Sequence, residues 1–223
     1  MRFCIVIPAF NEAKTIGQVV ETLRLKGFAV VVIDDGSCDH TGQIAQARGA
    51  VVILHEKNKG KGASLQDGFY YAIQKNYEWV LTMDGDGQHD PADIPQFIEK
   101  AKANPRSVIT GNRMHNHQGM PLVRLCTNRF MSGLISGLCK QEIPDTQCGF
   151  RLISCDILKE IKLTAGDYEI ETEVLIKASK KNFKIYSVPV QTIYLDEASK
   201  INPIIDTLRF IRYIIKEIFS PKP

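Results

Sequence analysis

Short, continuous apolar runs alternate with segments that carry apolar residues at helical spacing along the N-terminal half of the chain. The runs are Phe3–Ile7, Phe28–Ile33, Val51–Leu54 and Trp79–Met83. Such runs are typical of strands buried on both faces, and helices between them cover the two faces of a parallel sheet. The alternation therefore predicts an α/β fold with a mostly parallel sheet flanked by helices.

The segments between the runs predict the helices. The first helix opens at Asn11–Thr15 and places Ile16, Val19, Val20 and Leu23 at helical spacing. Further helices are expected at about 41–48, 63–76, 91–103 and 121–138, and further strands at about 108–110 and 183–190. The pattern is less regular in the C-terminal half, where residues 145–151 are expected to form a loop.

Length and composition indicate one globular α/β domain. The chain has 223 residues, is 44% hydrophobic and 24% charged, and carries a net charge of +3, which is too small to argue for a nucleic-acid partner. Its six cysteines form no Cys-x-x-Cys pair, so we expect reduced thiols and no zinc site. No apolar run approaches the roughly 18 residues of a membrane span, so the chain is not expected to cross a bilayer.

Four loops are predicted to converge at the carboxyl ends of the strands, where ligands bind in parallel sheets. They are Pro8–Glu12, Asp34–Ser37, Asn58–Gly62 and Asp84–Asp90. In the last loop two carboxylates leave a buried strand on a glycine-containing turn, and their i, i+2 spacing points both side chains the same way. A divalent ion held by so few carboxylates keeps positions open for phosphate oxygens. The alternative is an ordinary turn capped by aspartates.

Several motifs, taken together, resemble family 2 glycosyltransferases of the GT-A fold, and the resemblance covers nearly the whole chain. The motifs are Ile7–Glu12, Val32–Ser37, Asn58–Gly62 and Asp84–Gln88. Three further motifs are similar to the branch that includes dolichol-phosphate mannosyltransferases and other polyprenyl-phosphate glycosyltransferases: Gly111–Arg113, Asp145–Arg151 and Ser199–Lys200. The resemblance implies a Rossmann-like sheet and transfer of a sugar from a nucleotide sugar linked to GDP or UDP.

The resemblance also implies a donor site. Its donor-binding positions are Pro8, Phe10, Glu12, Val32, Asp34, Lys61, Asp84, Gly85, Asp86 and Arg113. Asp34 is expected to accept from a base N–H and Glu12 from ribose hydroxyls, while Phe10 stands where relatives often carry Tyr. The implied metal positions are Asp84, Asp86 and Gln88, with Mg²⁺ or Mn²⁺ as the ion that neutralises the leaving nucleotide. For Lys61 a solvated lysine is the alternative.

The implied catalytic residues are Asp86, Arg113, Asp145 and Arg151, and the implied acceptor-binding residues are Arg151 and Lys200. Transfer to a hydroxyl needs a general base, whereas a phosphate monoester, with a second pKa of about 6, is already anionic near neutrality. Such an acceptor needs cations to hold it, and arginines supply them. For Arg113 a surface ion pair is the alternative, and Asp145 either serves the acceptor side or orients Arg151.

The chain is expected to divide into a GT-A domain at 1–198 and an amphipathic helix at 199–223. The helix has one apolar stripe, formed by Ile201, Ile204, Ile205, Leu208, Ile211, Ile215, Ile218 and Phe219. It either packs on the domain or lies on a membrane with its basic flank toward anionic lipid. The second arrangement predicts a peripheral enzyme at the cytosolic membrane face, bound to the bilayer surface or to an integral membrane partner.

The predicted activity is metal-dependent, inverting transfer of a hexose, mannose or glucose first among them, to a polyprenyl phosphate. Two alternatives remain open from the sequence. One is the same chemistry on a hydroxyl acceptor such as a saccharide. The other is a non-catalytic nucleotide-sugar-binding module, which the retained acidic and basic positions argue against.

Overall fold

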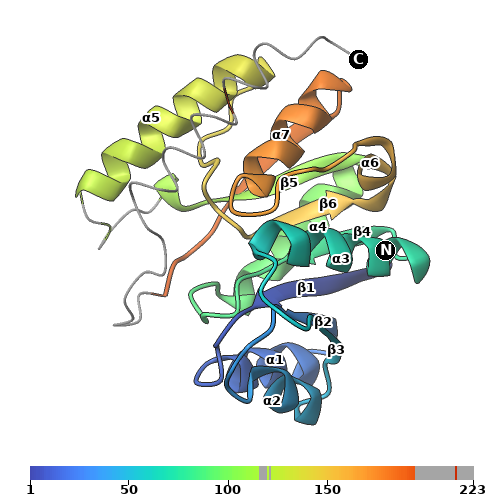
Figure 1. Cartoon of the computed structure of the whole chain (residues 1–223). Helices are drawn as coiled ribbons and strands as arrows, with labels where there is room; N and C mark the ends of the chain where they lie inside the picture. Colours follow the sequence, from blue (N-terminus) through green and yellow to red (C-terminus); the bar gives the residue numbers. More distant parts are fainter. Residues whose placement is uncertain (116–119, 121, 194–213, 215–223) are drawn as a thin grey trace.

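Seven strands form one sheet in the order β3-β2-β1-β4-β6-β5-β7 (Figure 1). The computed structural model describes residues 1–115, 120, 122–193 and 214. The strands are β1 Phe3–Ala9, β2 Ala29–Asp34, β3 Val51–Leu54, β4 Trp79–Thr82, β5 Ser107–Asn112, β6 Arg151–Ser154 and β7 Lys184–Pro189. All neighbouring strands are parallel except β6, which is antiparallel to both β4 and β5. The mostly parallel sheet predicted from the sequence is confirmed.

Helices cover both faces of the sheet because successive strand residues point to opposite faces. In β1, Cys4 and Val6 belong to one hydrophobic core, whereas Ile5 and Ile7 belong to the other. The first core includes residues of α3 Lys61–Gln74, α5 Leu122–Cys139, α6 Cys155–Glu160 and α7 Ile170–Lys180. The second includes residues of α1 Ile16–Leu25, α2 Thr41–Ala47 and α4 Ile94–Ala103.

The N-terminal elements match the sequence prediction closely, and the C-terminal ones match it less well. The predicted helix at 91–103 begins as a short 3-10 helix, η1 Pro91–Asp93, which the Asp90 side chain caps by accepting a hydrogen bond from the Ala92 amide. Helix α3 begins at Lys61, earlier than predicted. The strand β6 and the helices α6 and α7 were not predicted. The described cysteines are free thiols, four of them buried.

The four predicted loops do meet at one edge of the sheet. The Asn11 amide donates to Ser37 Oγ at 2.9 Å, and Thr15 Oγ1 donates to the Gly85 carbonyl at 2.7 Å. The Asp35 carboxylate accepts from the Gly60 amide at 2.9 Å, which links the second and third loops. These contacts place the loops after β1, β2, β3 and β4 around one site.

Two predictions concern the C-terminal segment. Lys200 and the amphipathic helix expected at 199–223 lie outside the described residues, apart from Ile214, which is buried. Within the part of the chain that the structure describes, no helix combines the length and the apolar character needed to cross a membrane.

Candidate active site

A lysine bridges two carboxylates just beyond the end of β4. Lys61 Nζ, at the first position of α3, lies 2.7 Å from Asp84 Oδ1 and 2.7 Å from Glu171 Oε1, which comes from α7. Burial alone would lower the pKa of Lys61, but the two carboxylates outweigh it and raise that pKa above its usual range. Lys61 is therefore held by two carboxylates and is not the solvated lysine that the sequence left open.

Asp84 has a second partner on its other oxygen. His89 Nε2 lies 3.2 Å from Asp84 Oδ2, and the His89 ring stacks on Phe150 with centroids 4.9 Å apart. Burial would raise the pKa of Asp84, but Lys61 and His89 outweigh it and hold that pKa far below its usual range. Asp84 is thus a carboxylate that stays ionised, and His89 reaches this site while Asp90 caps the following helix.

The chemistry of the acidic turn fits a divalent cation. Burial and the neighbouring charge of Asp84 raise the pKa of Asp86. The nearby cations therefore do not fully offset the repulsion between the two carboxylates. Asp86 Oδ1 accepts from the Gln88 amide at 2.9 Å, which orients the carboxylate. Among the described residues no three acidic, His or Cys side chains form a closed cage. Two carboxylates at this spacing would leave the remaining positions of an ion to water or phosphate oxygens.

Arg113 and Asp145 form a buried, two-pronged ion pair. Arg113, in the 3-10 helix η2 Arg113–His115 after β5, has its Nε 2.7 Å from Asp145 Oδ2 and its Nη2 2.9 Å from Oδ1. Both residues are buried, at 6% and 0% exposure. Burial would raise the pKa of Asp145, but the hydrogen bonds and charge of Arg113 lower it. This corrects two alternatives: Arg113 is not in a surface pair, and Asp145 orients Arg113 instead of Arg151.

Arg151 begins β6 and lies inside the protein, with 1% of its surface exposed. Its Nε donates to the Cys148 carbonyl at 2.7 Å and its Nη2 to the Thr146 carbonyl at 2.8 Å, while Nη1 donates to the Glu171 carbonyl. The guanidinium thus ties the loop before β6 to the start of α7. Arg151 therefore lies beneath the surface of the site. Its guanidinium N–H groups are buried in this arrangement, so they are not exposed for the predicted contact with an acceptor.

The positions predicted to hold the nucleoside differ in accessibility. Phe10 is 37% exposed, and Glu12 packs near Gly85, where an added Cβ would lie 3.5 Å from Glu12 Cγ. The Asp34 carboxylate accepts from the Ser37 amide at 3.0 Å. The Val32 side chain lies wholly within the second core, so it supports the site from below. Pro8 is half-buried in β1.

Glu171 is the site residue that sequence reasoning missed. Its segment has acidic residues at alternate positions, Glu169, Glu171 and Glu173, which indicate a helix start as readily as a binding site. The contact of Glu171 with Lys61 joins residues 110 positions apart. No local pattern encodes such a contact.

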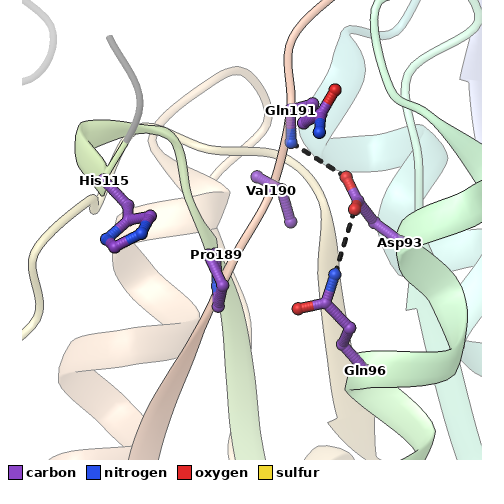
Figure 2. A pocket seen from close by; sticks show the side chains of 6 residues that line it. All are labelled: Asp93, Gln96, His115, Pro189, Val190 and Gln191. Atoms are coloured by element: carbon purple, nitrogen blue, oxygen red, sulfur yellow. Dashed lines mark hydrogen bonds between the residues drawn. The ribbon is translucent and has the colours of Figure 1, made fainter.

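A small cavity of about 200 Å³ lies beside the ends of β5 and β7 (Figure 2). It is lined by Asp93, Gln96, His115, Pro189, Val190 and Gln191. Asp93 accepts from the Gln191 amide at 2.9 Å and from Gln96 Nε2 at 3.1 Å, so its carboxylate holds the chain after β7 in place. None of the predicted site residues lines this cavity, but the chain after β7 continues to the acidic turn, where the Ile193 amide donates to the Gln88 carbonyl at 3.0 Å.

Comparisons with known proteins agree with this geometry. The family model described as glycosyl transferase family 2 matches residues 4–162. An uncharacterized protein of Methanocaldococcus jannaschii is 35% identical, over 96% of this chain and 98% of its own length. The UDP-N-acetylglucosamine–dolichyl-phosphate N-acetylglucosaminyltransferase of Methanococcus voltae is 31% identical, over 86% of each chain.

The fold is also found among solved structures. Glucosyl-3-phosphoglycerate synthase from Mycobacterium tuberculosis, solved with Mn²⁺, UDP and phosphoglyceric acid, is similar with a TM-score of 0.74 and 20% identity. The match covers 98% of this chain and 78% of that one. The chain therefore belongs to glycosyl transferase family 2 and is a glycosyltransferase with a GT-A-type fold.

Proposed function

We propose that this enzyme transfers a sugar, with inversion, from a nucleoside diphosphate sugar to a polyprenyl phosphate. The observation that carries the donor half is the cluster of Asp84, Asp86 and Lys61 at the carboxyl edge of the sheet, beside Glu12 and Asp34. Carboxylates for a metal and a cation for phosphate are the groups that a departing nucleoside diphosphate requires.

UDP is the nucleotide we favour. The relative from Methanococcus voltae uses a UDP-linked sugar by name, and the similar solved structure contains UDP. Phe10 offers an exposed ring for a base, and Asp34 and Glu12 are acceptors for base N–H and ribose hydroxyl groups. The sugar is a hexose or an N-acetylhexosamine. The resemblance of the motifs suggests mannose or glucose, and the name of the Methanococcus voltae relative suggests N-acetylglucosamine.

Asp84 and Asp86 would hold Mg²⁺ or Mn²⁺, and the ion would neutralise charge on the leaving diphosphate. Gln88 is retained as a further candidate ligand from the sequence. If Asp84 held a cation, Lys61 would lose one of its two partners but would keep Glu171. Its ammonium would then be available within the same cluster for a phosphate oxygen.

Arg113 is the acceptor-side cation that we favour. An arginine has five N–H donors, and the pair with Asp145 engages only part of the guanidinium. Asp145 fixes its plane, so further donors keep one orientation toward an acceptor phosphate. Arg151 acts as a positioning residue beneath this region, and Lys200 remains a candidate from the sequence alone.

The outward face of α5 supports association with a membrane surface. Leu122, Val123 and Phe130 are 77%, 80% and 73% exposed, while the opposite side of the helix enters the protein. The exposed Arg124 and Arg129 also lie on this helix. An apolar face flanked by arginines suits an interface with anionic lipid, where a polyprenyl phosphate is found.

The test is transfer of radiolabel into an organic phase. Purified protein is incubated with Mn²⁺ or Mg²⁺, a polyprenyl phosphate and a panel of UDP- and GDP-linked sugars. Metal-dependent label from one donor, lost in Asp86→Asn, supports the proposal. Donor hydrolysis without lipid label favours a hydroxyl acceptor, and a small phosphorylated hydroxy acid is the first such acceptor to add. No turnover with any donor contradicts the proposed reaction.

A further inference from the structure

Outside the acidic turn, a histidine is enclosed between two carboxylates. His55 Nδ1 lies 2.6 Å from Asp35 Oδ1, and His55 Nε2 lies 2.8 Å from Asp67 Oδ2. His55 follows β3 and is 4% exposed, while Asp35 follows β2 and Asp67 lies on α3. The three residues therefore connect two strand ends to the helix that carries Lys61.

Both ring nitrogens of His55 face a carboxylate oxygen within hydrogen-bond distance, and an imidazole N–H donates to a carboxylate, which only accepts when ionised. Among the described residues the charged partners of His55 are these two carboxylates. The charged residues of its own segment, Glu56, Lys57 and Lys59, are exposed.

Asp35 also forms hydrogen bonds to the loop that precedes Lys61. Its Oδ1 also accepts from the Lys59 amide at 2.9 Å, and its Oδ2 accepts from the Gly60 amide at 2.9 Å. Gly60 has a φ of 96° and is the residue directly before α3, so the turn depends on glycine and on these two bonds. The direction of the Asp35 carboxylate thereby sets where α3 and Lys61 begin.

We propose that His55, held between Asp35 and Asp67, is a positioning residue that fixes the Lys59–Gly60 turn and so aims Lys61 at the nucleotide. The inference rests on the proposed nucleotide site. His55 itself touches neither substrate nor metal in this role. Loss of its hydrogen bond would free Asp35 to rotate and would weaken binding of the diphosphate.

The first measurement uses the full chain labelled with ¹⁵N and needs no substrate. Long-range imidazole spectra of the five histidines are compared with those of His55→Asn, which identifies the His55 signal. We expect a signal that marks Nδ1 as an N–H hydrogen-bonded to Asp35. In Asp67→Asn this Nδ1 signal should persist, because Asp35 still accepts from it. A His55 ring whose Nδ1 carries no hydrogen would overturn the proposal.

The second measurement is calorimetric affinity for UDP with Mn²⁺. In His55→Asn the side-chain amide can still donate to Asp35 but cannot reach Asp67. We expect affinity about tenfold weaker than in the wild type. His40→Asn, at an exposed histidine that contacts Gln43, should bind as the wild type does.

The two proposals fail separately. If the wild type binds no nucleotide, the proposed function is contradicted, while the amide signals of Lys59 and Gly60 in His55→Asn still report the turn. Shifted signals with faster amide exchange support the positioning role. Unchanged signals, or unchanged nucleotide affinity in a wild type that does bind, would overturn it.

Discussion

The backbone at Gly149 lies against Asp84: a Cβ atom at residue 149 would be 2.9 Å from Asp84 Oδ2. The same atom would lie 2.9 Å from Glu171 Oε1, so the glycine closes the cluster around Lys61. Since Gly149 does not have a left-handed backbone, an alanine there would act through this steric conflict.

We expect Gly149→Ala to lower kcat/KM at least about tenfold by displacing Asp84. The fold should survive, because the crowding is confined to two side chains at the site. Steady-state kinetics and thermal unfolding together check this. Gly166→Ala is the matched control, since an added Cβ there meets nothing within 4 Å. Equal activity of both variants would show that the close approach is unimportant.

The Arg113–Asp145 pair predicts a loss of stability as well as activity. The Arg113→Ala variant would leave the buried Asp145 charge without its partner. Removing one member of a buried pair typically costs about 3–5 kcal/mol. Urea unfolding measures that cost directly.

A double variant separates the two roles of this pair. Arg113→Met with Asp145→Leu removes both charges together, so much of the lost stability should return. Transfer should remain absent, because the acceptor cation is still missing. Recovery of transfer in the double variant would show that Arg113 acts only structurally.

Glu173 predicts a specific pH dependence of stability. This wholly buried carboxylate accepts from the amides of Thr164 and Ala165 and contacts Lys177 Nζ at 2.6 Å. Burial would raise its pKa, but the bonds from Lys177 and the two amides lower it. A lowered pKa means that the stabilisation is present above the unfolded pKa, about 4.3, and is lost as pH falls through the folded pKa.

We therefore expect Glu173→Gln to be less stable than the wild type by about 1–3 kcal/mol at neutral pH. The difference in stability should shrink as the pH falls below about 4.3, because the Glu173 carboxylate of the wild type then becomes protonated and loses the interactions of its charged form. Denaturant titrations across this range check the sign. Glu160→Gln, in an exposed pair with Arg106, should change stability little at any pH. A difference that grows in acid would contradict the assignment.

The outward face of α5 predicts a separable membrane function. Phe130→Ser should reduce co-sedimentation with anionic vesicles several-fold, because a large exposed apolar side chain is lost from the interface. Transfer to a short, water-soluble polyprenyl phosphate should be unaffected. Leu25→Ser, at an 83% exposed leucine on α1, is the control. If both variants bind vesicles as the wild type does, α5 is not the docking face.

Local patterns predicted the elements that are locally determined. The strands before Asp34 and Asp84 are continuous apolar runs, and their carboxyl ends meet because parallel strands share an edge. Strand β6 escaped prediction because only Leu152 and Ile153 of its four residues are apolar, and it owes its burial to β4 and β5 on either side. Such a strand carries little signal in its own sequence.

Site residues were found where a motif named them, but their partners were not. Arg113 and Asp145 were both identified, but not as partners, because 32 positions separate them in the sequence. One predicted role of Asp145 was to orient Arg151 instead. Glu171 was missed because its role arises only when α7 packs beside α3. Side-chain pairing across the fold depends on tertiary packing, which spacing along the chain does not record.

The reversal of β6 determines which loops can evolve new chemistry. Because β6 runs against β4, with Arg151 opposite Thr82, the connection that enters β6 arrives at the ligand edge, while the one that leaves it emerges on the far side. Variation just before Arg151 would thus face the candidate site, whereas the turn directly after Ser154 lies on the far side. Because β6 is antiparallel, the loop that precedes it faces the candidate site. In a purely parallel sheet the loop before this strand would lie at the opposite edge.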